Sequence, residues 1–281
     1  MAHYHFMHYL PHPLVHGPKG YAEVIETLAW GLQQLGHDTS QAVNGIDPQA
    51  VNIVFGAHML QLETLQQLPS NSIVFNMEQM RNRAAEDTNR QMHLIAQRFE
   101  VWEYSTANLA AWDELGAVRV KVVPVGYAPV LTRVPKPAVQ DIDVLLYGIS
   151  GVKRLQAVHD LSKRGLATVF VSGLYGRARD NLIARSKLVL NVNLHEYAQI
   201  FEIVRVSYLL ANRKAVVATK DPLTVAEADI EAAVKFTSAE QLTVDCVRLI
   251  EDDVERAALE ARGFEIFSKR DIRVSLRAAL L

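Results

Sequence analysis

The chain has 281 residues, enough for one large domain or two of ordinary size. Hydrophobic residues make up 49% of the sequence and charged residues 21%, a balance that is typical of a globular protein and excludes a disordered chain. The formal net charge of -2 excludes an overall basic field that would attract nucleic acid or anionic lipid.

The single cysteine, Cys246, excludes an internal disulfide and a cysteine-rich metal site. Residues 1–8 have neither the basic region nor the apolar core of a signal peptide. No stretch reaches the roughly 18 to 20 apolar residues that span a bilayer. These features predict a cytoplasmic protein and leave peripheral membrane contact open.

The first half alternates short apolar runs with helical runs, a pattern that favours a parallel sheet covered by helices. The clearest helix spans residues 21–35, where apolar residues recur at helical spacing and Gly36 follows in the usual C-cap place. Further helices are expected at residues 89–99 and 107–115. Strands are expected at residues 3–10, 51–55, 72–77, 101–104 and 118–123. Residues 1–125 are therefore predicted to form one Rossmann-like domain.

A proline-rich stretch, residues 126–140, is predicted to be a linker, because proline continues neither a helix nor a central strand. Residues 141–281 then repeat the alternating pattern and end in a mostly helical tail. Strands are expected at residues 142–148, 168–171, 188–191 and 215–218, and helices at 153–164, 177–185 and 200–212. The predicted fold is α/β, with two Rossmann-like doubly wound domains facing a cleft. Ligands of such sheets bind at the carboxyl ends of the strands.

The loop that enters the first helix carries His16, Gly17 and Gly20. Glycines allow a ligand to approach the backbone closely, and a helix start offers N–H groups to an anion. The loop lacks the G-x-G-x-x-G pattern, which makes a dinucleotide site a weak interpretation, and a simple tight turn remains an alternative. His16 is a candidate general base, because the pKa of free histidine lies near working pH. The several histidines near the start lack the spacing of a metal site.

Two further candidates follow strands of the first half. Glu78 comes directly after the strand at residues 72–77, where it would bind the acceptor or act as the base, and an N-cap or surface role is an equal alternative. His58 follows the strand at residues 51–55 and is a candidate for acceptor binding on the same grounds.

The loop after the first strand of the second half suits a diphosphate. It contains Gly148 and Ser150, and the helix that it opens carries Lys153 and Arg154. Glycines, a hydroxyl and two cations at a helix start are the groups that bind phosphate oxygens. The alternative is an ordinary solvated helix start.

Polar residues also follow the strand at residues 188–191. Glu202 and Arg205 are three residues apart and share one helical face, where they would form at least a local ion pair. In the functional interpretation, the two oxygens of Glu202 accept hydrogen bonds from neighbouring ribose hydroxyls. Tyr175, Asn193 and His195 are expected to border the base and the sugar.

These stretches together resemble bacterial GT-B glycosyltransferases, particularly their short members, over most of the chain. The resemblance is carried by residues 35–38, 76–79, 102–105 with Asn108, 125–127, 141–148, 187–191, and Phe201 and Glu202 with Arg205. It implies a nucleotide-sugar donor in the second domain and an acceptor in the first. We further expect no cofactor and no divalent metal, because fixed cations and helix ends can offset the charge of the leaving group.

The resemblance is incomplete in one motif. The larger retaining relatives carry two glutamates eight residues apart, whereas Glu202 is the only carboxylate at residues 202–210. The stereochemical outcome therefore stays open. Two alternatives also remain: a sugar-nucleotide epimerase or hydrolase on the same scaffold, and a catalytically silent module that binds a nucleotide sugar or carbohydrate. Either one, like the transferase, could act as a homo-oligomer.

Overall fold

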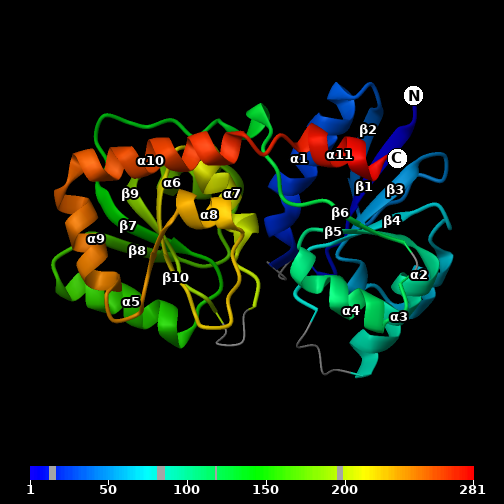
Figure 1. Cartoon of the computed structure of the whole chain (residues 1–281), viewed down its shortest axis with the longest axis horizontal. Coiled ribbons are helices and arrows are strands. Elements are labelled where there is room, and N and C mark those ends of the chain that lie inside the picture. The colour runs from blue at the N-terminus through cyan, green and yellow to red at the C-terminus, as the bar shows by residue number, and fades with distance from the viewer. Residues whose placement is uncertain (13–16, 81–85, 118, 195–198) are drawn as a thin grey trace. The chain divides into compact units, whose positions relative to one another are not determined.

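The chain forms two compact units, each built around one parallel sheet (Figure 1). Unit 1 comprises Met1–Ala128 and Asp271–Leu281, and unit 2 comprises Pro129–Arg270. The computed structural model describes residues 1–12, 17–80, 86–117, 119–194 and 199–281. The predicted α/β class is confirmed, because every strand pairing within the two sheets is parallel.

The sheet of unit 1 has six strands in the order β2-β1-β3-β4-β5-β6. Its strands are β1 (His3–His8), β2 (Asp38–Val43), β3 (Val51–Phe55), β4 (Ile73–Asn76), β5 (Glu100–Glu103) and β6 (Val120–Val122). The central strands β3 and β4, with the sequences VNIVF and IVFN, have the near-continuous apolar runs expected of parallel strands covered on both faces. The edge strand β2 was not predicted, because its sequence DTSQAV is largely polar and no residue in it is fully buried.

The helices of unit 1 follow the predicted pattern. They are α1 (Ala22–Gln34), α2 (Leu62–Gln67), α3 (Glu86–Arg98), α4 (Leu109–Glu114) and α11 (Ile272–Ala279), with short 3-10 turns η1 (Gly17–Tyr21), η2 (Ala57–Met59) and η3 (Thr106–Asn108). In α1 the apolar positions Val24, Ile25, Leu28 and Leu32 are buried, as their spacing predicts. Gly36 closes this helix at a φ of 85°, a conformation that glycine adopts without strain.

The last helix, α11, belongs to unit 1, whereas the sequence prediction placed residues 271–281 in the second domain. It lies against α1 (Figure 1), and Gly31 of α1 makes that contact possible. A Cβ atom on Gly31 would lie 2.5 Å from Leu276 Cδ1 and 2.9 Å from Ile272 Cγ2. The Ile272 N–H also donates to the Tyr127 carbonyl. The chain therefore returns to its first sheet after completing the second.

The sheet of unit 2 has five strands in the order β11-β10-β9-β7-β8. Its strands are β7 (Ile142–Tyr147), β8 (Thr168–Val171), β9 (Ser186–Asn191), β10 (Ala215–Thr219) and β11 (Lys235–Thr237). Its helices are α5 (Val152–Lys163), α6 (Gly176–Arg185), α7 (Ile203–Ala211), α8 (Ala228–Ala233), α9 (Leu242–Glu251) and α10 (Asp253–Ser268), and the turn η4 (Pro129–Leu131) precedes them. Cys246 on α9 is fully buried, and burial raises the pKa of its thiol to about 12.

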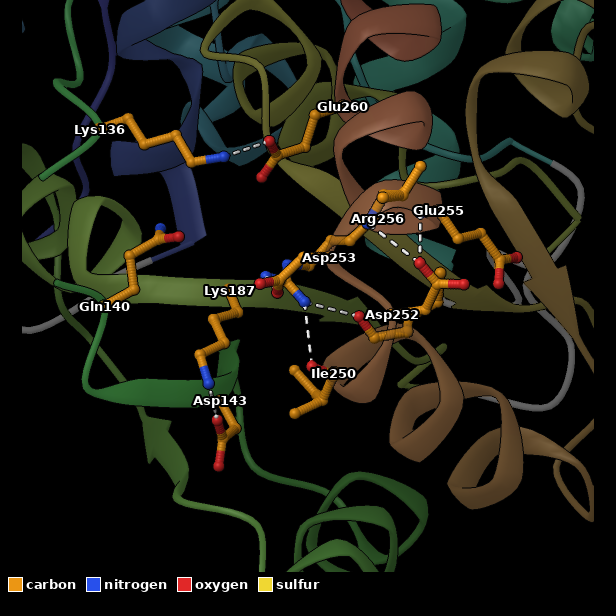
Figure 2. A network of polar contacts seen from close by, with 12 residues as sticks. Lys136, Gln140, Asp143, Lys187, Ile250, Asp252, Asp253, Glu255, Arg256 and Glu260 are labelled. Atoms are coloured by element: carbon orange, nitrogen blue, oxygen red, sulfur yellow. Dashed lines mark hydrogen bonds and ion pairs between the residues drawn. The ribbon is translucent and has the colours of Figure 1, made fainter. Parts of the chain in front are cut away.

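Charged side chains gather where the strands of the second sheet begin (Figure 2). Lys187 Nζ lies 2.7 Å from Asp143 Oδ1, and Lys136 Nζ lies 2.5 Å from Glu260 Oε2. Lys214, just before β10, is 3% exposed and donates to the Ser186 carbonyl at 2.6 Å. Burial lowers the pKa of Lys214 from its ordinary value of 10.5 to about 8, and the Glu260 carboxylate opposes this shift.

The depressed pKa of Lys214 predicts that the contribution of this residue to the stability of unit 2 increases as the pH rises from 8 to 10.5, while the buried thiol of Cys246 acts in the opposite direction above pH 9. In this window the unfolded chain binds the Lys214 proton and the folded chain releases it, so the contribution of Lys214 to the free energy of unfolding increases with pH, by up to about 3 kcal/mol. Below pH 8 both states bind the proton, and this contribution is constant. In denaturant unfolding, the stability of the wild type relative to Lys214→Met should therefore grow over this window, whereas the stability of the wild type relative to the exposed Lys269→Met should stay constant. Parallel pH profiles of wild type and Lys214→Met would contradict the prediction.

Candidate functional site

Both sheets contain a point where the strand order changes direction. In unit 2 the chain passes from β7 to β8 on one side and then to β9 on the other. In unit 1 it passes from β1 to β2 and then to β3. Ligands of open α/β sheets bind outside the carboxyl ends of the strands at such a point. The segments after β7 and β9, and those after β1 and β3, are therefore the places where chemistry is expected.

In unit 2 this point holds three charged side chains. Arg154 Nη2 donates to Glu202 Oε1 at 2.7 Å, and Arg205 Nη1 lies 2.8 Å from Glu202 Oε2. Arg154 is buried, with 1% of its side chain exposed, whereas Glu202 and Arg205 are 23% and 17% exposed. The cluster thus consists of one carboxylate between two guanidinium groups, with a net charge of +1 and one arginine nearer to solvent.

Arg154 comes from the first turn of α5, and its remaining donors are directed into the protein. Its Nε donates to the Val192 carbonyl at 2.7 Å and its Nη1 to the Ile149 carbonyl at 2.9 Å. It therefore ties the segment after β9 to the loop after β7. Burial lowers the pKa of this guanidinium, but arginine stays protonated in proteins, so Glu202 neutralises a permanent charge.

Gly148 lets both guanidinium groups approach the backbone. A Cβ atom at this position would lie 2.8 Å from Arg205 Nη2 and 3.1 Å from Arg154 Nη1, and the φ of Gly148 is 133°. Arg205 also donates to Asn191 Oδ1 at 3.1 Å and stacks over the Tyr147 ring, with 5.5 Å between its Cζ and the ring centroid. The predicted glycine loop is therefore packed against the chain's own cations.

The other predicted donor residues lie at varying depths in unit 2. Lys153 pairs with Asp221 at 3.2 Å, and Ser150 is exposed in the loop before α5. Asn193 is buried and donates to Asp221 Oδ2 at 3.0 Å and to Thr224 Oγ1 at 2.9 Å. Tyr175 is the N-cap residue of α6. His195 lies outside the described residues.

In unit 1 the structure brings together Glu78 and His58, which were predicted separately. Glu78 follows β4, and His58 lies in η2, just after β3. The Tyr21 hydroxyl donates to Glu78 Oε1, and His58 Nε2 lies 3.8 Å from the same oxygen. The His8 ring, at the end of β1, lies 6.0 Å from the Tyr21 ring. Glu78 keeps 30% of its side chain exposed, so a substrate can reach it.

Tyr21 was missed as a site residue, because the apolar periodicity of α1 identified it only as the start of that helix. The feature of the sequence that could have identified Tyr21 as a site residue is its position directly after the glycine loop. Of that loop, Gly17 and Gly20 lie in η1, and a Cβ atom on Gly20 would meet no atom of the described residues within 4 Å. Packing against that part of the chain therefore does not require glycine at position 20. His16, the other predicted base, lies outside the described residues.

Within the described ranges, no three histidine, cysteine or carboxylate side chains are grouped to hold a metal ion. The absence of a metal requirement stays a prediction. None of the helices in those ranges is long and apolar enough to cross a membrane.

Comparison with known proteins identifies the fold. No protein-family model matches the sequence, and no curated protein sequence matches it significantly. Among solved structures, Anabaena HepE bound to UDP and glucose is similar at a TM-score of 0.65 and 13% identity, over 100% of this chain and 99% of HepE. T4 phage BGT bound to UDP and Mn²⁺ is similar at a TM-score of 0.61 and 13% identity, over 100% of this chain and 99% of BGT. TarM is similar at a TM-score of 0.59 and 12% identity, and this chain spans 54% of its length. The predicted GT-B fold is thereby confirmed.

Proposed function

We propose that this chain is a glycosyltransferase that moves a sugar from a nucleotide-sugar donor to an acceptor hydroxyl. The observation that carries the proposal is the cluster of Arg154, Glu202 and Arg205 at the carboxyl edge of the second sheet, within a GT-B fold. HepE was solved with UDP and with UDP-glucose, and BGT with UDP, so uridine nucleotides are the first donors to test.

Unit 2 would bind the donor. Arg205 is the better candidate for the diphosphate, because it is more exposed than Arg154 and lies over the glycine loop. Arg154 holds the loop and Glu202 in place. Each oxygen of Glu202 already pairs with one arginine, and a carboxylate oxygen can accept a further hydrogen bond, which leaves room for ribose hydroxyls. Lys153, Ser150, Asn193 and Tyr175 would complete the donor site.

Unit 1 would bind and activate the acceptor, with His58 and the glycines of η1 among its contacts. In the reaction, the acceptor oxygen forms a bond to the anomeric carbon of the sugar, and the bond from that carbon to the diphosphate breaks. Glu78 takes the proton of the acceptor hydroxyl, and Tyr21 orients the carboxylate. Arg205 offsets the charge that develops on the leaving nucleoside diphosphate.

The donor site can be tested by thermal stability in the presence of nucleoside diphosphates and UDP-glucose. A ligand that binds only the folded state at one hundred times its Kd stabilises it by about 2.7 kcal/mol. We expect one nucleoside diphosphate to raise the melting temperature of the wild type and of Arg185→Gln, and to have little effect on Arg205→Gln. Arg185 is the matched control, because it is an exposed arginine of the same unit that pairs with Asp141.

The outcomes of this test separate the alternatives. A shift with UDP-glucose and release of UDP only when an acceptor is present supports the transferase. Binding without consumption indicates a silent binding module, and consumption without an acceptor indicates a hydrolase. No shift with any nucleotide or nucleotide sugar would refute the proposed function.

A further inference from the structure

A buried carboxylate, Glu103, lies at the end of β5 and accepts four hydrogen bonds. Its side chain is fully buried. Oε2 accepts from Asn76 Nδ2 and Trp112 Nε1, both at 2.7 Å. Oε1 accepts from the Ser105 N–H at 2.9 Å and from Asn108 Nδ2 at 3.0 Å. Burial raises the pKa of Glu103, and these bonds oppose the rise. All four partners are donors, and only the ionised carboxylate, which is purely an acceptor, satisfies them all.

Two of these donors connect Glu103 to Glu78. The amide nitrogen of Asn76 also donates to the Glu78 carbonyl at 3.0 Å, and that of Asn108 donates to the same carbonyl at 2.8 Å. Each amide therefore gives one hydrogen to Glu103 and the other to Glu78. The amide oxygens complete the frame, because Asn76 Oδ1 accepts from the Glu78 N–H and Asn108 Oδ1 from the Met80 N–H.

We infer that Glu103 is a positioning residue for Glu78, acting through Asn76 and Asn108. As an acceptor-only group it turns both amide nitrogens inward, which directs their remaining hydrogens at the Glu78 carbonyl and their oxygens at the Glu78 and Met80 N–H groups. The backbone that carries the Glu78 carboxylate is thereby held from both sides. The inference rests on the proposed function, since it assigns Glu78 a proton to take.

The test is Glu103→Gln, which keeps the shape of the side chain and replaces one acceptor oxygen by a donor. Either orientation of the new amide places its NH₂ against two donors, so at least one asparagine must turn. We expect kcat with UDP-glucose to fall by about 10²-fold, with KM for UDP-glucose within about twofold of the wild type. Amide hydrogen exchange of residues 78–80 should become faster.

Two controls separate positioning from general damage. Asn52→Ala removes another buried amide of unit 1, which bonds to the Asp47 and Ala50 carbonyls, and should lower stability without lowering kcat. In a Glu78→Gln background, Glu103→Gln should cause little further loss of kcat, because both changes act on one step.

A kcat of Glu103→Gln that matches the wild type, or a full additional loss in the Glu78→Gln background, would overturn the inference. If the wild type consumes no nucleotide sugar, the proposed function fails, and hydrogen exchange decides about Glu103 separately. Unchanged exchange at residues 78–80 would then refute its positioning role, and faster exchange would support it.

Discussion

Glu202→Ala is expected to lower the free energy of unfolding of unit 2 by about 3 kcal/mol, a large loss for one side chain outside the apolar core. Arg154 is 1% exposed, and Glu202 is its carboxylate partner at 2.7 Å. Removal of that partner leaves a buried charge without compensation, which costs more than the pair itself contributes. Denaturant unfolding measures the effect.

Two variants control this prediction. Glu255→Ala breaks a pair with Arg248 whose two side chains are 37% and 47% exposed, and such a surface pair contributes less than about 1 kcal/mol. Arg154→Met in the Glu202→Ala background removes the unpaired charge and should restore part of the stability. If Glu202→Ala loses no more stability than Glu255→Ala, the buried-charge argument is wrong.

The expected loss of stability in Glu202→Ala also affects the choice of variant for measuring donor binding. A nucleotide shift that is absent in Glu202→Ala does not by itself assign Glu202 to the ribose, because the variant also releases Arg154 and Arg205. Glu202→Gln keeps one acceptor oxygen and is the better probe of the ribose contact. The Arg205 side chain is 17% exposed, so Arg205→Gln should perturb the fold less than Glu202→Ala. This variant tests the proposed contact between Arg205 and the diphosphate directly.

The sequence predicted the strands well where they are buried on both faces. Residues 51–55 form β3 with the predicted bounds. A short apolar run between polar segments is too short for a typical helix and therefore favours a buried strand. The edge strand β2 has no such run, since among the described strands it pairs with β1 alone and its residues remain partly exposed. Its existence depends on pairing with β1, which local pattern does not encode.

The position of α11 shows a second limit. Its apolar residues Ile272, Leu276 and Ala279 are buried and recur at helical spacing, so the helix itself was predictable. The identity of the sheet it covers was not, because an apolar face fits any complementary surface. The partner is set by Gly31, whose missing side chain creates room for Leu276.

For the candidate sites, the sequence predicted which ends of the strands carry the functional residues, but not which of these residues contact one another. Glu202 and Arg205 were paired correctly from their spacing of three residues. The bond between Glu202 and Arg154 joins residues 48 positions apart, and nothing in the local pattern indicates that Arg154 points inward. The convergence of Tyr21, His58 and Glu78 likewise follows from the order of the strands, which becomes visible only in the folded chain.

Glu78→Gln is expected to lower kcat by about 10²- to 10⁴-fold, with little change in KM for the donor. The carboxylate of Glu78 is partly exposed and is held by the Tyr21 hydroxyl, so it is oriented and can still reach a substrate. Glutamine keeps the hydrogen bond from Tyr21 but does not accept a proton at working pH. Initial rates of UDP release from UDP-glucose, at saturating acceptor, measure the effect once an acceptor is identified.

The comparison with His58 decides which group is the base. His58 Nε2 lies 3.8 Å from Glu78, so either residue is close to the proton to be removed. If Glu78 is the base, His58→Gln should reduce kcat far less than Glu78→Gln does. The control is Glu63→Gln on α2, which changes another exposed glutamate of unit 1 and should leave kcat unchanged. A larger loss in His58→Gln would transfer the role to the histidine and leave Glu78 as the residue that orients it. A rate for Glu78→Gln within threefold of the wild type would exclude Glu78 from proton transfer, because an oriented base contributes far more than that.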